Sequence, residues 1–135
     1  MRNLLLIFLF CFAANSYATP DKENAALNAA NEWLKLVDTG KYKESYREAA
    51  SFFKSKVTGP QWEKLVKEAR DPLGKLLNRK LKVKQYTTSL PEAPEGQYVV
   101  IQFNSTFEKK RGAVETITPM LDKDKKWRVS GYYIK

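Results

Sequence analysis

Hydrophobic and polar positions in the first half of the chain alternate with the helical period of about 3.6 residues. They predict one helix that ends before Gly40 and a second that follows it. A third helix is predicted to begin at Thr58, in a capping-box sequence, and to end at Asp71-Pro72. The predicted inward positions are Ala26, Ala30, Trp33, Leu34 and Val37, then Tyr42, Tyr46, Ala49, Ala50 and Phe53, then Trp62, Leu65, Val66 and Ala69.

After Gly74 the period of the pattern shortens to about 2, which marks a change from helices to strands. Four strands are predicted, over residues 79–89, 98–107, 113–121 and 126–134. Because they are consecutive and joined by short connections, they should form an antiparallel meander. The chain is therefore predicted to be an α+β domain, with three N-terminal helices packed on a curved four-stranded antiparallel meander sheet.

Residues 1–18 have the pattern of a cleavable signal peptide. Arg2 gives the basic start, residues 4–14 are apolar, and Ala18 ends a small-residue cleavage pattern. The apolar run is shorter than the ~20 residues that span a bilayer, and no later segment is longer, so no stable membrane anchor is expected. Cys11 is interpreted as an ordinary residue of this run, because a bulky phenylalanine precedes it where a lipoprotein site has a small residue.

The segment that remains, residues 19–135, is predicted to be a single domain. It has no internal repeat, and it has no cysteine, so we expect neither a disulfide nor thiol chemistry. We expect the domain to be exported through the cleavable signal peptide and to be periplasmic or secreted.

Composition and charge narrow the chemistry that this domain can perform. The chain has 135 residues, with 24 Lys+Arg against 15 Asp+Glu, a formal net charge of +9 and no histidine. The lack of histidine excludes triads of the Ser-His-Asp kind and histidine-based metal sites. No phosphate-binding loop, nucleophile elbow or calcium loop occurs. We therefore predict no metal and no cofactor.

Four strings of sequence occur in a fixed order: YTTSLP at 86–91, GQYVVIQF at 96–103, VETITPM at 114–120 and WRVSGYYI at 127–134. Together they resemble the bacterial domain of unknown function 4019 family. The resemblance extends over roughly residues 26–134 and implies no established activity. The order of helices and then a meander also resembles the nuclear transport factor 2-like and cystatin-like folds. That resemblance implies a cone in which a bent sheet wraps the helices, often around a pocket, and it assigns no function by itself.

Glu115 is the carboxylate of most chemical interest. It alternates with Ala113 and Ile117, so it points into the fold if those two residues face inward. A buried carboxylate of this kind can act as an acid or base, with a tyrosine such as Tyr132 as its partner. Two other interpretations stay open: Glu115 pairs with Arg128 on the neighbouring strand, or the opposite strand parity leaves Glu115 in water.

Four polar or amphipathic strand residues are candidates for lining the mouth of a pocket. Tyr98, Gln102, Ser130 and Tyr132 carry groups that can hydrogen-bond a small ligand, and with Glu115 they form the predicted ligand-binding set. The same residues are also consistent with a plain outer sheet face. A third interpretation is a homodimer that forms through the sheet face, since tyrosine is enriched at protein interfaces.

The densest basic run lies on the first predicted strand, and a second basic group follows the second strand. One interpretation is a positive patch that meets anionic lipid headgroups or cell-wall polymers. The other is an edge strand whose lysines prevent pairing with other chains. No nucleic-acid partner is expected, because no binding motif is present and the predicted leader exports the chain. The basic residues are Lys75, Arg79, Lys80, Lys82 and Lys84, then Lys109, Lys110 and Arg111.

These observations lead to one main hypothesis and two rivals. The main hypothesis is a small exported, non-enzymatic domain of the bacterial envelope that binds an unidentified small ligand or envelope protein, or associates with itself. The first rival is an enzyme of the cone fold that uses Glu115 as acid or base. The second is a basic binder of envelope surfaces.

Overall fold

The computed structural model describes the backbone of residues 2–135 and the side chains of residues 19–135. The predicted signal peptide, with Cys11 and the cleavage position after Ala18, lies outside the residues whose side chains are described. Among the described residues, no helix is both long enough and apolar enough to cross a membrane.

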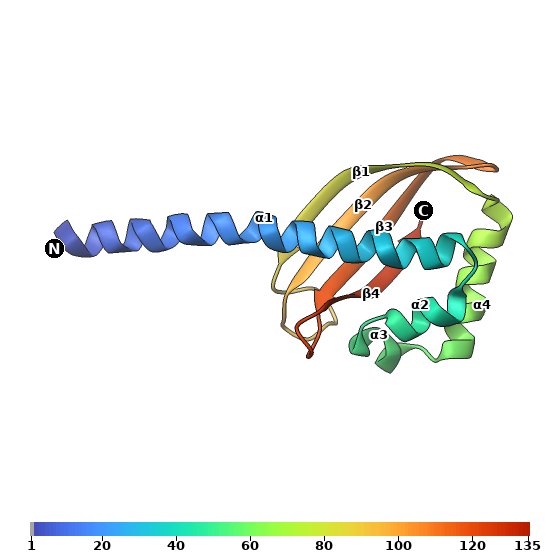
Figure 1. Cartoon of the computed structure of the whole chain (residues 1–135), viewed down its shortest axis with the longest axis horizontal. Helices are drawn as coiled ribbons and strands as arrows, with labels where there is room; N and C mark the ends of the chain where they lie inside the picture. The colour runs from blue at the N-terminus through green and yellow to red at the C-terminus, as the bar shows by residue number, and fades with distance from the viewer. Residues whose placement is uncertain (1) are drawn as a thin grey trace.

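Helices come first along the chain and strands follow (Figure 1). The sheet has the order β1-β2-β3-β4, and every neighbouring pair is antiparallel, so the predicted α+β class and the meander are confirmed. The elements are α1 (Arg2–Asp38), α2 (Tyr42–Glu48), α3 (Ser51–Lys56), α4 (Gly59–Arg70), the 3₁₀ helix η1 (Asp71–Leu73), β1 (Leu76–Thr87), β2 (Tyr98–Phe107), β3 (Lys110–Leu121) and β4 (Trp127–Ile134).

Residues 2–135 form four α-helices, not the predicted three, because the second predicted helix is broken at Ala49-Ala50. Both alanines are extended, with ψ angles of 162° and 153°. The break lets the backbone N–H of Ala50 donate to the carbonyl of Val129 on β4 at 2.8 Å. It also lets the N–H of Ser51 donate to the carboxylate of Asp122 at 2.9 Å. Hydrogen bonds to the end of the sheet therefore replace the helical bonds that the pattern predicted.

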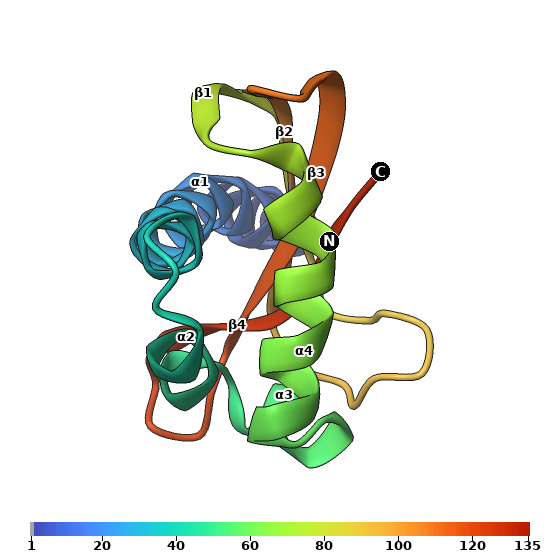
Figure 2. The same cartoon turned by 90° about the vertical axis from the view of Figure 1, so that its right-hand side faces the viewer.

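Helix α1 lies across one face of the curved sheet and contacts all four strands. The shorter helices α2, α3 and α4 pack at one end of α1 and of the sheet (Figures 1 and 2). The opposite face of the sheet carries no helix in the part of the chain that the structure describes (Figure 2). The fold therefore has one covered face, which holds the core, and one uncovered face.

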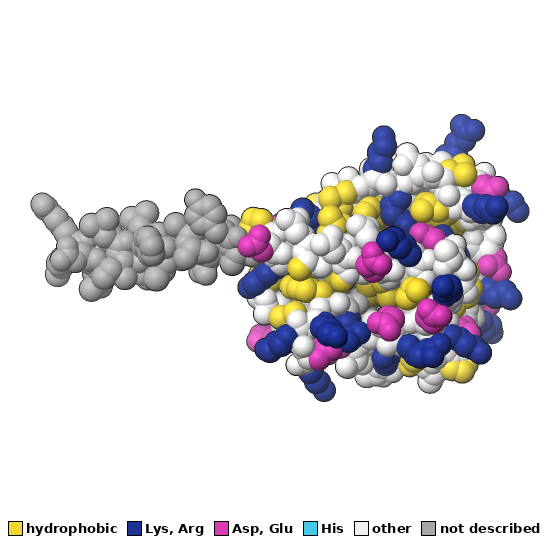
Figure 3. All heavy atoms as spheres, in the orientation of Figure 1, with side chains coloured by type: hydrophobic (Ala, Val, Ile, Leu, Met, Phe, Trp, Pro, Cys, Tyr) yellow, Lys and Arg dark blue, Asp and Glu magenta, His cyan; other side chains and the backbone are white. Residues whose placement is uncertain are grey.

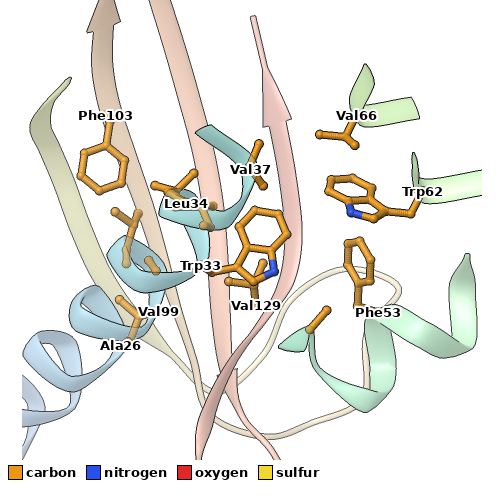
Figure 4. Close-up of a cluster of buried hydrophobic side chains, with 14 residues drawn as sticks. Ala26, Trp33, Leu34, Val37, Phe53, Trp62, Val66, Val99, Phe103 and Val129 are labelled. Atoms are coloured by element: carbon orange, nitrogen blue, oxygen red, sulfur yellow. The ribbon is translucent and has the colours of Figure 1, made fainter. Parts of the chain in front are cut away.

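The core between the helices and the sheet contains a cluster of aromatic rings (Figure 4). The Trp62 ring lies 5.7 Å from the ring of Trp33 and 5.0 Å from that of Phe53, measured between centroids. Ser45 satisfies both indoles: its carbonyl accepts from Trp33 Nε1 at 2.8 Å and its hydroxyl accepts from Trp62 Nε1 at 2.9 Å. This buried serine on α2 thus fixes the orientation of two tryptophans on α1 and α4.

Helix α4 begins with the predicted capping box but is rotated relative to its predicted orientation. Thr58 Oγ1 accepts from the N–H of Gln61, and Gln61 Oε1 accepts from the N–H of Thr58. Leu65 and Ala69, which were predicted to face inward, are exposed, Leu65 at 55%. The residues that α4 buries follow four-residue steps and include a charge; they are Trp62, Val66 and Arg70. The prediction for Leu65 and Ala69 was wrong because Arg70 turns inward to an ion pair.

Candidate functional site

Glu115 lies in β3 with its side chain toward the helices. Ala113 and Ile117, two residues away on either side, are buried on the same face. The Glu115 side chain has no exposure to solvent. Of the two strand parities considered from the sequence, the protein therefore adopts the one that places this carboxylate inside.

The guanidinium of Arg79 on β1 is the main partner of Glu115. Its Nε donates to Oε1 at 2.7 Å and its Nη2 donates to Oε2 at 3.1 Å. Strands β1 and β3 are not neighbours, so the pair bridges over β2. On that strand Ser105 stands opposite Arg79 and donates its hydroxyl to Glu115 Oε1 at 2.5 Å. Burial lowers the pKa of Arg79, but the hydrogen bonds and charges of Asp38 and Glu115 outweigh it, so the net shift is upward.

Asp38, the last residue of α1, extends the pair to the helices. Its carboxylate accepts from Arg79 Nη1 at 2.8 Å and from Arg79 Nη2 at 3.0 Å. It also accepts from Nη2 of Arg70 on α4 at 2.9 Å. We name Arg70, Asp38, Arg79 and Glu115 the buried ion-pair network; their formal charges alternate and cancel.

Arg70 makes the fewest hydrogen bonds of the four members of the buried ion-pair network. Its side chain is 6% exposed, and its Nε and Nη1 have no hydrogen-bond partner. The guanidinium carbon lies 4.8 Å from the centroid of the Phe107 ring, within the range of a cation–π contact. The ring face therefore compensates part of the desolvation of this cation.

Tyr132 on β4 completes the surroundings of Glu115. Its hydroxyl donates to Glu115 Oε2, so the predicted pairing of these two residues is formed. Burial, and then the charge and hydrogen bond of Glu115, raise the pKa of Tyr132. Its ring packs edge-on against Trp33, with centroids 5.5 Å apart. Tyr132 is therefore held as a neutral donor to the carboxylate.

The hydrogen bonds to Glu115 decide what this arrangement can do chemically. Its two oxygens accept four bonds, two from Arg79, one from Ser105 and one from Tyr132. A carboxylate has about four lone-pair sites, so none is left for a substrate proton. A general base also needs to reach the proton that it removes. Glu115, as it stands, ties strands β1 to β4 to one another and is not poised as a base.

The alternative that paired Glu115 with Arg128 is wrong. The strand register places Ile134 opposite Glu115, whereas Arg128 lies opposite Met120, towards the other end of β4. Arg128 instead donates to Asp124 in the β3–β4 turn at 2.8 Å. The sequence identified the correct pair of strands but could not supply their register.

The other three predicted ligand residues do not join Glu115 and Tyr132. Tyr98 is fully buried, and its hydroxyl donates to the carbonyl of Pro94 at 2.5 Å. Gln102 Nε2 donates to Thr116 Oγ1 at 3.2 Å. Ser130 Oγ donates to the backbone carbonyl of Thr118 at 2.7 Å. Each of these polar groups thus has a partner within the protein, and the three do not converge on one site.

Gln102 belongs to the side of the sheet that no helix covers. Two adjacent cross-strand rows on this side contain no charged residue, and we name them the uncovered face. Val83 and Tyr133, at the two ends of one row, are 42% and 58% exposed. The rows are Val83, Gln102, Thr116 and Tyr133, and Gln85, Val100, Thr118 and Gly131.

None of four hollows on the surface of the described residues is lined by a predicted ligand residue. One of about 300 Å³ is lined by Asp38 and Arg70, so the buried ion-pair network borders the surface at its helix end. Within the described part of the chain, no three His, Cys, Asp or Glu side chains come together as a metal site.

Three members of the buried ion-pair network were missed as site residues from the sequence. Asp38 follows Leu34 by four residues, and Arg70 follows Val66 by four, so both continue the buried stripes of their helices. Arg79 was assigned to the basic run. The four-residue spacing of Asp38 and Arg70 indicated that both side chains are buried. Their charge argued against this interpretation, because isolated charges are rarely buried.

Comparison with known proteins identifies a family. A family model described as "Protein of unknown function (DUF4019)" matches residues 29–132, which includes every member of the buried ion-pair network. No curated protein and no solved structure matches the chain. The expected nuclear transport factor 2-like or cystatin-like cone therefore stays a prediction.

Proposed function

The chain belongs to the DUF4019 family of proteins of unknown function, and from its geometry we propose that it is a small exported, non-enzymatic interaction domain of the bacterial envelope. Its predicted leader supports export. The absence of cysteine after residue 18 fits a domain whose stability does not depend on the redox state of its surroundings.

The state of Glu115 is the observation that carries the proposal. Its carboxylate is fully buried and accepts four hydrogen bonds within the protein. For Glu115 and Tyr132 to act as an acid–base pair, Arg79 would have to release the carboxylate and a path to solvent would have to open. Leaving a guanidinium without its partner in the interior costs several kcal/mol. This cost favours a structural role for Glu115 over the enzyme alternative.

The uncovered face is the surface through which we propose that the domain works, and a second copy is the partner. The chain is strongly basic, so most contacts between two copies bring like charges together. The uncovered face avoids this repulsion because its eight residues are all uncharged. Val83 and Tyr133 give the exposed apolar and aromatic area that interfaces favour.

Light scattering of the exported chain over a wide range of concentrations tests this proposal. The wild type should have the mass of a dimer at high concentration. Tyr133→Asp should shift the chain to a monomer, because it places an unpaired charge inside the contact. The matched control is Leu65→Asp on α4, which is equally exposed and lies outside the uncovered face, and which should still dimerise. A wild-type monomer at every concentration would contradict self-association.

A further inference from the structure

The β2–β3 turn packs onto the start of β1 and builds one compact end of the sheet. The N–H of Glu108 donates to the carbonyl of Lys75, and the N–H of Lys109 donates to that of Leu73, both at 2.9 Å. Gly74 permits this approach: its φ is +73°, and a Cβ there would lie 3.0 Å from the Cβ of Glu108. Segments more than thirty residues apart in the sequence are thereby held together.

This end of the sheet gathers more positive than negative charge. Lys75, Lys109, Lys110 and Arg111 are exposed, and within the described residues none of them forms an ion pair. The nearby carboxylate of Glu108 is turned back onto the N–H of Lys75, at 2.6 Å. Lys and Arg side chains project from the upper edge of the domain, above β1, in the view of Figure 3.

An exposed leucine stands among these cations. Leu77 is 64% exposed, more than the other exposed hydrophobic residues Leu65, Leu81, Val83 and Tyr133. The register of β1 with β2 shifts between Leu76 and Asn78, so Leu77 is the extra residue of a bulge and has no partner on β2. Leu76 pairs with Phe107 on β2, and Phe107 pairs with Lys110 at the start of β3. Leu77 therefore lies about two strand spacings, or ~10 Å, from Lys110.

We infer that this end of the sheet, the basic tip, docks on the surface of an anionic lipid bilayer. The basic tip is Lys75, Leu77, Lys109, Lys110 and Arg111. Lysine and arginine side chains near an anionic membrane are each attracted to it, and an aliphatic side chain beside them can enter the headgroup boundary. A soluble polyanion would use the cations but would gain nothing from Leu77. The combination of both features therefore selects a lipid surface over a polymer.

The inference goes beyond the proposed self-association and uses a different surface. The uncovered face is uncharged and spans the four strands, whereas the basic tip is at the β2–β3 turn. Either surface can work without the other. Failure of one test therefore leaves the other proposal in place.

Co-sedimentation of the exported chain with vesicles tests the inference. The vesicles contain phosphatidylglycerol and phosphatidylcholine, with pure phosphatidylcholine as the neutral reference. The wild type should bind only the anionic vesicles, and binding should fade as salt rises, because exposed charges are screened over about 10 Å at 0.1 M salt. Binding that is equal on neutral vesicles, or that does not change with salt, overturns the inference.

Paired variants separate the contributions of charge and of the leucine. Lys109→Gln with Lys110→Gln should weaken binding about 25-fold, at ~1 kcal/mol for each cation. Leu77→Ser should weaken it about tenfold. The controls on α4 are Lys64→Gln with Lys67→Gln, and Leu65→Ser, which remove the same charge and the same exposed side chain elsewhere and should leave binding unchanged.

Two results from these variants would contradict the inference. If Leu77→Ser binds as the wild type while the double lysine variant is weakened, the basic tip is a polyanion site and not a membrane surface. If the α4 controls lose as much as the basic-tip variants, the attraction is a property of the net charge and not of this site. All variants share the same N-terminus, so differences between them come from the substituted side chains.

Discussion

Arg79 on β1 and Glu115 on β3 form two hydrogen bonds, of 2.7 and 3.1 Å, over the strand that separates them. The same guanidinium also binds Asp38 at the end of α1, so one side chain links an edge strand, a central strand and the main helix. Such a link fixes how the helix sits on the sheet. The link also occupies the Glu115 carboxylate, which an enzyme with Glu115 as its acid or base would need to be free.

Ser45→Ala should destabilise the protein although the side chain that it removes is small. The variant leaves the buried N–H of Trp62 without an acceptor, and an unsatisfied buried donor costs about 1–3 kcal/mol. Urea unfolding followed by tryptophan fluorescence measures the loss. Ser55→Ala is the control, because Ser55 is exposed and bonds only to its own helix. Equal stability of the two variants would show that the Ser45 hydroxyl does not hold Trp62.

Stability should fall at alkaline pH, and Tyr132 should cause part of the fall. Burial and Glu115 raise the pKa of Tyr132 in the folded state, so above the unfolded value of about 10 the unfolded chain loses a proton that the folded chain keeps. The stabilisation is complete below that pH, and it declines above it by ~1.4 kcal/mol per pH unit.

Unfolding of wild type and Tyr132→Phe across this pH range tests the contribution. The variant should show a shallower decline, which does not vanish, since burial also raises the pKa values of Tyr42 and Tyr98. Parallel pH profiles for the two proteins would mean that Tyr132 does not titrate as its surroundings require.

Gly74→Ala should destabilise the junction between η1 and β1. The residue has a φ of +73°, and the new Cβ would lie 3.0 Å from Glu108, so backbone strain and crowding add to about 1–3 kcal/mol. Thermal unfolding gives the cost. At Gly112 no atom lies within 4 Å of such a Cβ, and Gly112→Ala should be nearly neutral. A Gly74→Ala protein as stable as Gly112→Ala would exclude the close approach.

The sequence was sufficient for the order of elements but not for details that depend on tertiary contacts. The meander followed from its period of 2 and short turns. The break at Ala49-Ala50 could not be predicted, because two alanines favour a helix and only hydrogen bonds to β4 and Asp122 end it. The inward rotation of Arg70 likewise depends on Asp38, which is thirty-two residues away in the chain.

The candidate site, like the fold, could be predicted from the sequence only in part. The partnership of Glu115 and Tyr132 was among the sequence hypotheses, because both fall on adjacent predicted strands. The parity of β3 was left open, since apolar residues occur on both of its faces, such as Ile117 on one and Met120 on the other. Arg79 was not recognised as the partner of Glu115 because it lies two strands away. The local pattern of hydrophobic and polar residues does not determine which residues of two strands lie side by side.

The free energy of unfolding of Glu115→Gln tests the central claim most directly. If Glu115 is a structural anion, this variant leaves Arg79 with one partner fewer in the interior and should lose about 3 kcal/mol or more. Glu32→Gln, in the exposed pair with Lys35, is the control and should change stability by less than about 0.5 kcal/mol. Unchanged or increased stability of Glu115→Gln would contradict the account, since it is what a carboxylate kept for binding or catalysis at the expense of stability would give.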